Sequence, residues 1–389
     1  MTDPLRVVHL SVVHRPDDPR IYERQCRTLA AAGYDVTYLV PGATPGRDAH
    51  GVRRAALPLR PRSRRWLTMR DIVVALQGLR PHVVHTHDPE LLTLFPALRP
   101  FVPHLVHDFH EFLPEAVLTK EYIPARWRPL VAAASDMAQR GLARWADGVV
   151  VATDDILNDL GARPALRFVA PNYPRLAHFD GATPIPEIVA DPRLRLVYIG
   201  GLSQSRGVPL MLDVMARLEP GEAELLLGGI FSSRAFAAEV EARLPALADR
   251  VRFLGRVARD DVPRYLASAD VLWTPSRPSA QFSRPTVATK VFEGAAMGLA
   301  VLASDLPGRE IVADEGIGIN VAPDVEGHLG GIRRLTADRE AVRAMGQRAR
   351  AAVRERYCWE AVEERFLDFY ARLCSAGSRG RRPGSVPDR

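Results

Sequence analysis

Two positively charged side chains stand where helices are predicted to begin. Arg206 lies in the glycine-rich turn of YIGGLSQSRGVPLMLDVMARL, just before a helix with Pro209 in its first turn. Lys290 opens the helix after a long loop, and it is one of only two lysines among 52 lysines and arginines. A cation there opposes the helix dipole at a cost of roughly 0.3–1 kcal/mol, which a bound anion would remove. The pair predicts a diphosphate site, with a solvated Arg206 as the alternative.

Glu293 follows Lys290 by three residues and adds a different chemistry. A carboxylate accepts hydrogen bonds from two hydroxyl groups together, so Glu293 suits a diol. The alternative is a surface ion pair with Lys290, which would stabilise the helix by only about 0.2–0.5 kcal/mol.

Other nucleotide and metal motifs are missing from the sequence. Neither segment contains G-x-x-x-x-G-K-[ST] or G-x-G-x-x-G, and the first strand–helix turn, VVHRPDDPR, has no glycine. This disfavours a P-loop protein and, as the weaker rival, a nicotinamide oxidoreductase. No D-x-D pair calls for a divalent ion, so no obligatory metal is predicted. His85 and His87 share one strand face, but the sequence places no third metal ligand, and structural or sugar-contacting histidines are preferred.

The elements that would position these residues follow a regular rhythm. Short apolar runs alternate with helical-period segments, as in LRVVHLSVV, RIYERQCRTLAAAG and YDVTYLV, which predicts βαβ units around a parallel sheet. Residues 1–170 form a first lobe of this kind. In such sheets, ligands bind beyond the carboxyl ends of the strands, where loops lead into helices.

The rhythm breaks at 171–190, a proline-rich stretch that predicts a linker. A second strand–helix series over 191–352 forms a second lobe, so the fold class is α/β with two doubly wound, Rossmann-like lobes. An amphipathic closing helix is predicted over 353–374. The remainder, 375–389, has no apolar stripe and is predicted to be disordered.

Composition limits the class of protein. The 389 residues are 47% hydrophobic and 25% charged, as in soluble proteins. Part of the net charge of +6 lies in the arginine-rich final residues, so the folded body is only mildly basic and nucleic acid is not an expected partner. The sequence shows neither a membrane-spanning run nor a signal peptide, and its three cysteines lack metal or redox spacing; a cytoplasmic location is predicted.

One segment suggests a membrane surface. LRPRSRRWLTMR, residues 59–70, places five arginines beside Trp66 and Leu67, a pattern compatible with docking to anionic lipid. The alternative is a solvated face that flanks a helix.

Several longer motifs resemble the family 4 retaining glycosyltransferases of the GT-B fold. In the second lobe they are YIGGLSQSRGV, VRFLGRVARDDVPRYLASADVLWTP and TKVFEGAAMGLAVLASDLPGREIV; in the first they are DDPRIYERQCRTLAAAGYDVTYLV, VVHTHDPELL and LVHDFHEFLPE. The resemblance covers nearly the whole chain. It implies a cleft between the two lobes and transfer of a sugar from a nucleotide diphosphate sugar, with UDP or GDP, to a small-molecule or glycan acceptor.

The resemblance also implies roles on the donor side. Glu293 would bind the ribose of the donor and Arg206 its diphosphate. Lys290 and Thr289 would lie beside them, and Val257 would line the nucleobase pocket.

On the same grounds His110, in HDFHE, would face the donor sugar and join Arg206 and Lys290 as a catalytic residue. The two cations would stabilise the departing diphosphate, which is the largest expected catalytic effect. The acceptor would attack from the face of the leaving group, so that no protein nucleophile and no cofactor beyond the donor is needed.

Two positions depart from the family pattern. Pro285 stands where many members have a glutamate that contacts the donor sugar, and Gly201, a further candidate for the donor site, stands where members commonly have arginine. These departures keep open a second hypothesis, a non-catalytic subunit that only binds sugar nucleotides.

The acceptor side also differs from the family. The usual glycine-rich turn after the first strand is replaced by SVVHRPDDPRIYER, so that His14, Asp18 and Arg20, with His87, are predicted to meet the acceptor. The alternative for Asp18 is that it merely caps the helix beginning near residue 19 or 20.

Overall fold

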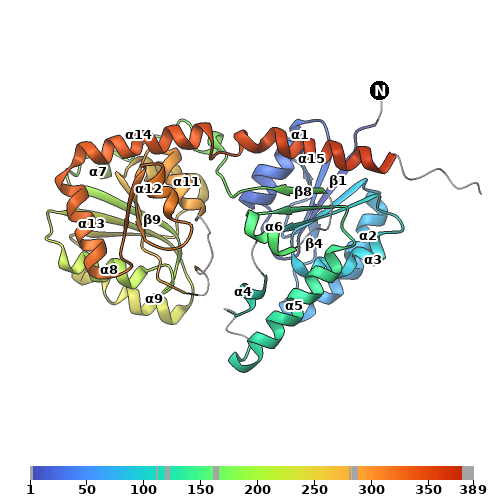
Figure 1. Cartoon of the computed structure of the whole chain (residues 1–389), viewed down its shortest axis with the longest axis horizontal. Coiled ribbons are helices and arrows are strands. Elements are labelled where there is room, and N and C mark those ends of the chain that lie inside the picture. The colour runs from blue at the N-terminus through green and yellow to red at the C-terminus, as the bar shows by residue number, and fades with distance from the viewer. Residues whose placement is uncertain are drawn as a thin grey trace, which may run out of the picture. The chain divides into compact units, whose positions relative to one another are not determined.

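The computed structural model describes residues 3–110, 113–118, 123–160, 166–279, 282 and 288–378. It divides into two units (Figure 1). The first comprises residues 1–172 together with 362–389, and the second comprises 173–361.

The first unit is built on one sheet with the strand order β3-β4-β2-β1-β5-β6-β7-β8. All neighbouring strands are parallel except the short β3, which runs antiparallel to β4. The central strands are buried on both faces, as expected for valine-rich parallel strands covered by helices. The strands are β1 (Arg6–Leu10), β2 (Asp35–Pro41), β3 (Gly46–Arg47), β4 (Arg53–Leu57), β5 (Val83–Thr86), β6 (His104–Phe109), β7 (Gly148–Val151) and β8 (Leu166–Val169).

Helices cover both faces of this sheet. Val8, Leu10 and Val84 point to the face packed by α2 and α3, whereas His9 and His85 point to the opposite face, where Tyr370 of α15 lies. The helical segments are η1, a π-helix (Pro19–Cys26), α1 (Arg27–Ala31), η2 (Arg62–Leu67), α2 (Thr68–Leu79), η3 (Pro89–Leu94), α3 (Phe95–Leu98), α4 (Leu113–Leu118), η4 (Ala125–Trp127), α5 (Arg128–Ala143), α6 (Asp154–Leu160) and α15 (Glu360–Ser378), which begins in the second unit.

The second unit has a fully parallel sheet with the order β11-β10-β9-β12-β13-β14. Figure 1 shows α8, α9 and α13 on one side of this sheet and α11, α12 and α14 on the other, and each side has its own apolar core. Its strands are β9 (Leu194–Leu202), β10 (Ala223–Phe231), β11 (Val251–Gly255), β12 (Val271–Thr274), β13 (Ala300–Ser304) and β14 (Gly318–Val321). Its helical segments are η5 (Leu176–His178), α7 (Pro186–Val189), α8 (Val208–Arg217), α9 (Arg234–Glu241), η6 (Leu244–Leu247), η7 (Arg259–Asp261), α10 (Val262–Ala267), α11 (Thr289–Ala296), α12 (Glu310–Asp314), α13 (Val325–Ala337) and α14 (Arg339–Glu355).

In both sheets the order in which successive strands are added reverses at a central pair of neighbouring strands, although the strands of that pair stay parallel. In the first unit β1 lies between β2 and β5, and in the second β9 lies between β10 and β12. The prediction of two doubly wound α/β lobes is therefore confirmed. Loops diverge at such a reversal and leave a crevice at the carboxyl ends of the two strands.

The segments outside the two series differ in detail from the sequence expectation. Phe179 and Ile188, within the stretch 171–190 predicted as a linker, are buried in the core of the second unit. The predicted closing segment 353–374 holds the end of α14 and most of α15, whose Phe366 and Tyr370 pack in the first unit. Helix α15 continues to Ser378, four residues into the predicted disordered tail, and residues 379–389 lie outside the described part.

Within the part of the chain that the structure describes, no helix combines the length and the apolar character needed to cross a membrane.

Candidate active site

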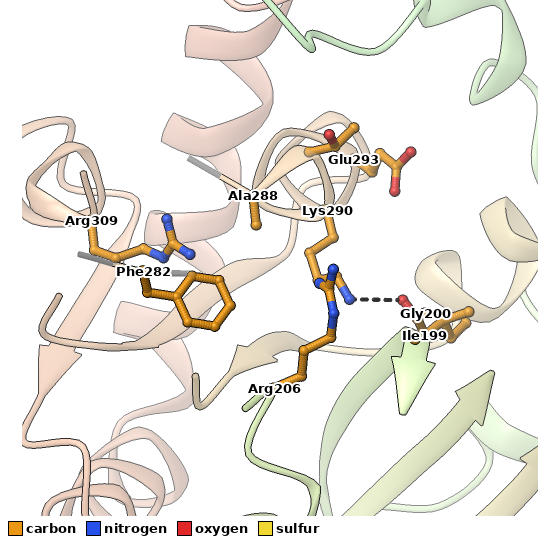
Figure 2. Close-up of a pocket in the computed structure, with 10 residues that line it drawn as sticks. Ile199, Gly200, Arg206, Phe282, Ala288, Lys290, Glu293 and Arg309 are labelled. Atoms are coloured by element: carbon orange, nitrogen blue, oxygen red, sulfur yellow. Dashed lines mark hydrogen bonds between the residues drawn. The ribbon is translucent and has the colours of Figure 1, made fainter. Parts of the chain in front are cut away.

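A cavity of about 390 Å³ opens at the strand reversal of the second unit. Its walls come from the end of β9, the turn before α8, the beginning of α11 and the turn before α12 (Figure 2). The described residues that line it are Ile199, Gly200, Gly201, Arg206, Phe282, Ala288, Thr289, Lys290, Glu293 and Arg309. Five of the six residues predicted for the donor site, all except Val257, are thus brought together.

Lys290 is held inside this cavity rather than in solvent. Its Nζ lies 3.8 Å from the centre of the Tyr198 ring and donates a hydrogen bond to the carbonyl oxygen of Ile199 at 3.3 Å. Burial, together with the positive charge of Arg206, lowers the pKa of Lys290 to about 7, although Glu293 opposes the shift. The lysine is therefore charged only part of the time near neutral pH, and a nearby anion would favour its charged form.

Gly200 leaves the space that the ammonium group of Lys290 occupies. A Cβ atom at Gly200 would lie 2.5 Å from Lys290 Nζ, so any side chain there would push the ammonium away. The backbone of Gly200 also has a φ of 154°, within the region that favours glycine. The glycine-rich turn thus serves both the shape of the backbone and the placement of the cation.

Arg206 enters the cavity from the turn that precedes α8. Its amide nitrogen is 3.3 Å from Ser203 Oγ, and the next residue, Gly207, has a φ of 78° and begins the helix. A Cβ atom at Gly207 would lie only 1.7 Å from the carbonyl oxygen of Pro275, beyond β12. Glycine is therefore required where the β9 turn packs on the β12 loop.

Arg309 is a third cation at this site, and sequence analysis missed it. It lies just before α12, is only 1% exposed, and its guanidinium carbon is 6.0 Å from the centre of the Phe282 ring. Burial lowers the pKa of Arg309, with the charge of Arg206 acting in the same direction. A signal was present, because Arg309 too follows a strand and precedes a helix, in LASDLPGRE.

The charges in the cavity do not balance. Figure 2 shows Arg206 and Lys290 reaching into the centre, Arg309 approaching from one side and the carboxylate of Glu293 on the other. Among the described lining residues there are three basic side chains and one acidic side chain. A half-buried site with this excess of positive charge is suited to an anion.

Val257, the sixth residue predicted for the donor site, lies elsewhere in the second unit. Val257, just beyond β11, is half-buried, and its methyl group packs 2.8 Å from where a Cβ atom of Gly228 would lie. It is not among the described residues that line the cavity. Pro285 lies outside the described residues.

In the first unit, the predicted acceptor residues gather beyond β1 and β5. His14 Nδ1 lies 2.9 Å from Asp18 Oδ2, and the rings of His14 and His110 meet edge to face at 4.9 Å. Burial would lower the pKa of His14, but the hydrogen bond with Asp18 and the charges of Asp18, Asp88 and Asp108 outweigh it and raise the pKa. His87 Nδ1 lies 3.1 Å from His110 Nε2, so these histidines form one cluster.

Asp18 and Arg20 have structural partners. Asp18 Oδ1 accepts hydrogen bonds from the amides of Arg20 and Ile21 at 2.8 and 2.9 Å, so the predicted helix cap is present. Arg20 points into the unit and binds Asp108 with two nitrogens, at 2.9 and 2.6 Å, and the carbonyl of Ala170 at 2.6 Å. With its guanidinium engaged in this way, Arg20 is placed to orient Asp108 rather than to meet a ligand.

The structure brings together two groups of side chains that could serve as metal ligands. His9 supplies the third ligand beside His85 and His87 that the sequence did not place, and His87, Asp108 and His110 form a second group. In both groups, however, nitrogens face one another at hydrogen-bond distance, such as His9 Nδ1 and His87 Nε2 at 3.0 Å. Arg20, bound to Asp108, also places a positive charge where a metal ion would need a free carboxylate.

Comparison with protein families gives matches in both units. A family model described as "Glycosyl transferase 4-like domain" matches residues 20–172, and one described as "Glycosyl transferases group 1" matches residues 193–338. The two matches together take in most of the chain. Among curated protein sequences none matches significantly.

Similar solved structures share the fold over nearly the whole chain. Sucrose-phosphate synthase from Thermosynechococcus elongatus has a TM-score of 0.77 and 22% identity, covering 96% of this chain and 100% of its own. HepE of Anabaena, in complex with UDP and glucose, has a TM-score of 0.72 and 16% identity, covering 95% and 100%. The catalytic domain of starch synthase IV from Arabidopsis thaliana, bound to ADP and acarbose, has a TM-score of 0.70 and 14% identity, covering 96% of this chain and 100% of that domain.

The contact at Gly207 gives a prediction about stability. Replacing Gly207 with alanine should lower the free energy of unfolding of the second unit by at least about 2 kcal/mol, because the new Cβ atom overlaps a backbone carbonyl and φ is positive. Chemical denaturation would measure the change. Gly221→Ala is the matched control, since a Cβ atom there meets nothing within 4 Å. Equal stability of the two variants would contradict the packing described.

Proposed function

Because the chain is a glycosyltransferase of family 4 with the GT-B fold, we propose that it transfers a sugar, with retention of configuration, from a nucleoside diphosphate sugar bound in the Lys290 cavity. The acceptor is a small molecule or glycan, and the reaction takes place in the cytoplasm. UDP and GDP are the donor nucleotides that the family resemblance implies.

The observation that carries this proposal is the meeting of Arg206, Lys290 and Arg309 around one cavity whose described lining residues include a single carboxylate, that of Glu293. A diphosphate carries two or more negative charges and would compensate this excess. Relatives of the same fold have been solved with UDP, UDP-glucose and ADP, which supports a nucleoside diphosphate as the ligand.

Glu293 gives the site its preference for a nucleoside. It lies one helical turn after Lys290 in α11 and lines the same cavity. Its carboxylate would accept hydrogen bonds from both ribose hydroxyls, while Thr289, at the first position of the helix, lies toward the phosphates. In this proposal the cations bind the phosphates of the donor and the carboxylate of Glu293 binds its ribose.

Catalysis follows from the placement of the cations. As the bond from the anomeric carbon to the diphosphate oxygen breaks, its electron pair stays on that oxygen, and preorganised positive charge stabilises it. The acceptor oxygen attacks from the same face, and its proton passes to the departing phosphate. His110 of the first unit is our candidate for contact with the donor sugar. Because three basic side chains supply the charge, we assign no obligatory metal to the reaction.

A panel of nucleotide sugars tests the assignment. Thermal stability of the protein should rise with UDP- or GDP-sugars beyond the effect of salt, since stabilisation grows as RT ln(1 + [L]/Kd). Transfer or slow donor hydrolysis should be detectable and should be lost in Glu293→Ala. Stabilisation without any turnover would favour the non-catalytic subunit, and no stabilisation would refute the donor site.

The cations can be ranked with the same assay. Arg206→Ala and Arg309→Ala should each lower kcat by on the order of 10²–10³. Arg234→Ala is the control, because Arg234 is an exposed arginine at the beginning of α9 and lies outside the described cavity lining. A similar loss in all three variants would show that the effect is not specific to the cavity.

The lowered pKa of Lys290 predicts a proton linkage. Bound diphosphate raises this pKa above about 7, so binding at pH about 8 should take up close to one proton per ligand, and Kd should rise as pH increases above 7, by up to about tenfold per unit. Titration calorimetry in buffers of different ionisation enthalpy measures the uptake. Lys290→Arg should abolish it, and an affinity that increases with pH would contradict it.

The segment 59–70 is also proposed to contact anionic membrane surfaces, because it leaves Leu59 80% and Trp66 69% exposed beside basic residues. Sedimentation with anionic vesicles should detect binding that is weakened in Trp66→Glu. Trp145→Glu, at another exposed tryptophan, serves as the control. Equal binding of both variants would remove this segment from consideration.

A further inference from the structure

A continuous row of polar groups crosses the α15 face of the first sheet. His110 Nε2 lies 3.2 Å from Asp108 Oδ2 and 3.1 Å from His87 Nδ1. His87 Nε2 lies 3.0 Å from His9 Nδ1. The row continues through Tyr370, whose hydroxyl lies 3.4 Å from His9 Nε2 and 2.7 Å from His85 Nδ1. Neighbouring groups in the row therefore face each other at hydrogen-bond distance. The ring nitrogen that carries the proton in one histidine determines which nitrogen can carry it in the next.

Asp108 fixes one end of this row. It is fully buried, and Arg20 binds both of its oxygens while Gln25 Nε2 donates to Oδ2 at 2.6 Å. Burial would raise the pKa of Asp108, but the charge of Arg20 and the neighbouring His110 hold it well below its usual value. An ionised carboxylate only accepts hydrogen bonds, so a group facing it must donate.

This requirement selects His110 as the donor. Oδ2 already accepts from Arg20 and Gln25, so it has little capacity for two further donors. His110 Nε2 is closer to it, at 3.2 Å, than His87 Nδ1, at 3.5 Å. With the proton on His110 Nε2, the facing His87 Nδ1 carries a lone pair, which removes the clash of two N–H groups 3.1 Å apart.

The direction then propagates along the row as far as His85, whose Nε2–H is left without a hydrogen-bond partner among the described residues. His87 and His9 are fully buried and burial lowers the pKa of each, so each carries a single proton. His87 Nε2–H donates to His9 Nδ1, and His9 Nε2–H donates to the hydroxyl of Tyr370. Tyr370, whose pKa is raised by burial, keeps its proton and donates to His85 Nδ1. The opposite direction would place the lone pair of His110 Nε2 3.2 Å from Asp108 Oδ2, closer than the 3.5 Å that separates the lone pair of His87 Nδ1 from this oxygen in the direction chosen.

We propose that Asp108 and His87 are positioning residues that hold His110 as its Nε2–H tautomer, so that His110 Nδ1 is presented as a hydrogen-bond acceptor for a sugar hydroxyl. The hydroxyl ligand rests on the proposed function, whereas the tautomer does not. His110 is suited to this role because it is the partly exposed end of the row, with 16% of its side chain accessible, while Asp108 and His87 are enclosed. A tautomer held in advance avoids reorganisation when the ligand arrives.

The tautomer can be read directly by long-range ¹H–¹⁵N correlation spectra of the ¹⁵N-labelled full chain, without turnover. His110 should show the Nε2–H pattern, and its assignment follows from loss of the signal in His110→Gln. A wild-type spectrum with the proton on Nδ1 overturns the proposal, whatever the fate of the donor site.

A variant tests the cause. In Asp108→Asn the side-chain amide can donate, so the proton of His110 should move to Nδ1 in a large fraction of molecules, and kcat/KM should fall by on the order of 10–100-fold while affinity for UDP is unchanged. His107 is the internal control, because it is paired with Thr86 outside the row. If Asp108→Asn does not fold, His87→Phe takes its place, which removes the Nδ1 lone pair facing His110 together with the contact of His87 Nε2 with His9. An unchanged tautomer in the folded variant would contradict a positioning role.

Discussion

Like-charge repulsion inside a half-buried cavity is the constraint on which the second unit depends. Like charges in a site of low effective dielectric constant repel one another, and Arg206, Lys290 and Arg309 line one cavity. Burial is the larger cause of the lowered pKa values of Lys290 and Arg309, and repulsion by Arg206 adds to it. Because the three cations repel one another, the surrounding packing must keep them in the cavity. Gly200 and Gly207 do so by letting backbone and ammonium approach more closely than a side chain would allow.

The two units use the same edge of a doubly wound sheet for opposite electrostatic purposes. In the second unit, residues beyond β9, before α11 and before α12 bring together positive charge. In the first, residues within and just beyond β1, β5 and β6 form a hydrogen-bonded set in which Arg20 is already neutralised by Asp108 and burial keeps His9 and His87 neutral. A site with excess charge suits phosphate, whereas a neutral, oriented set of nitrogens suits hydroxyl groups. The fold supplies the crevice in both cases, and the side chains decide the chemistry.

The features of the candidate site that can be predicted from the sequence are those set by neighbouring residues in the chain. The beginnings of α8 and α11 follow from strand, turn and apolar period, so Arg206, Lys290 and Glu293 were placed correctly in relation to their helices. Arg309 stands in an equivalent position but was lost among abundant arginines, since only the rare lysine attracted attention. His9 escaped because it lies within a strand, and its contact with His87 depends on β1 pairing with β5, a non-local pairing. Arg20 was expected to face a ligand, because a partner 88 residues away in sequence, Asp108, is invisible to local pattern.

The departure from the family at Gly201 can be understood from the same charges. An arginine at that position would extend from the end of β9, where a Cβ atom would already lie 3.5 Å from Arg206 Nε. A second guanidinium there would add to a repulsion that Lys290 and Arg309 already impose. Arg309 instead approaches from the α12 side, with Lys290 between it and Gly200 in Figure 2. Arg309 thus supplies a third cation from a direction different from that of position 201. A diphosphate held from two sides is clamped in orientation as well as in charge, so the loss of arginine at position 201 is compatible with an active donor site.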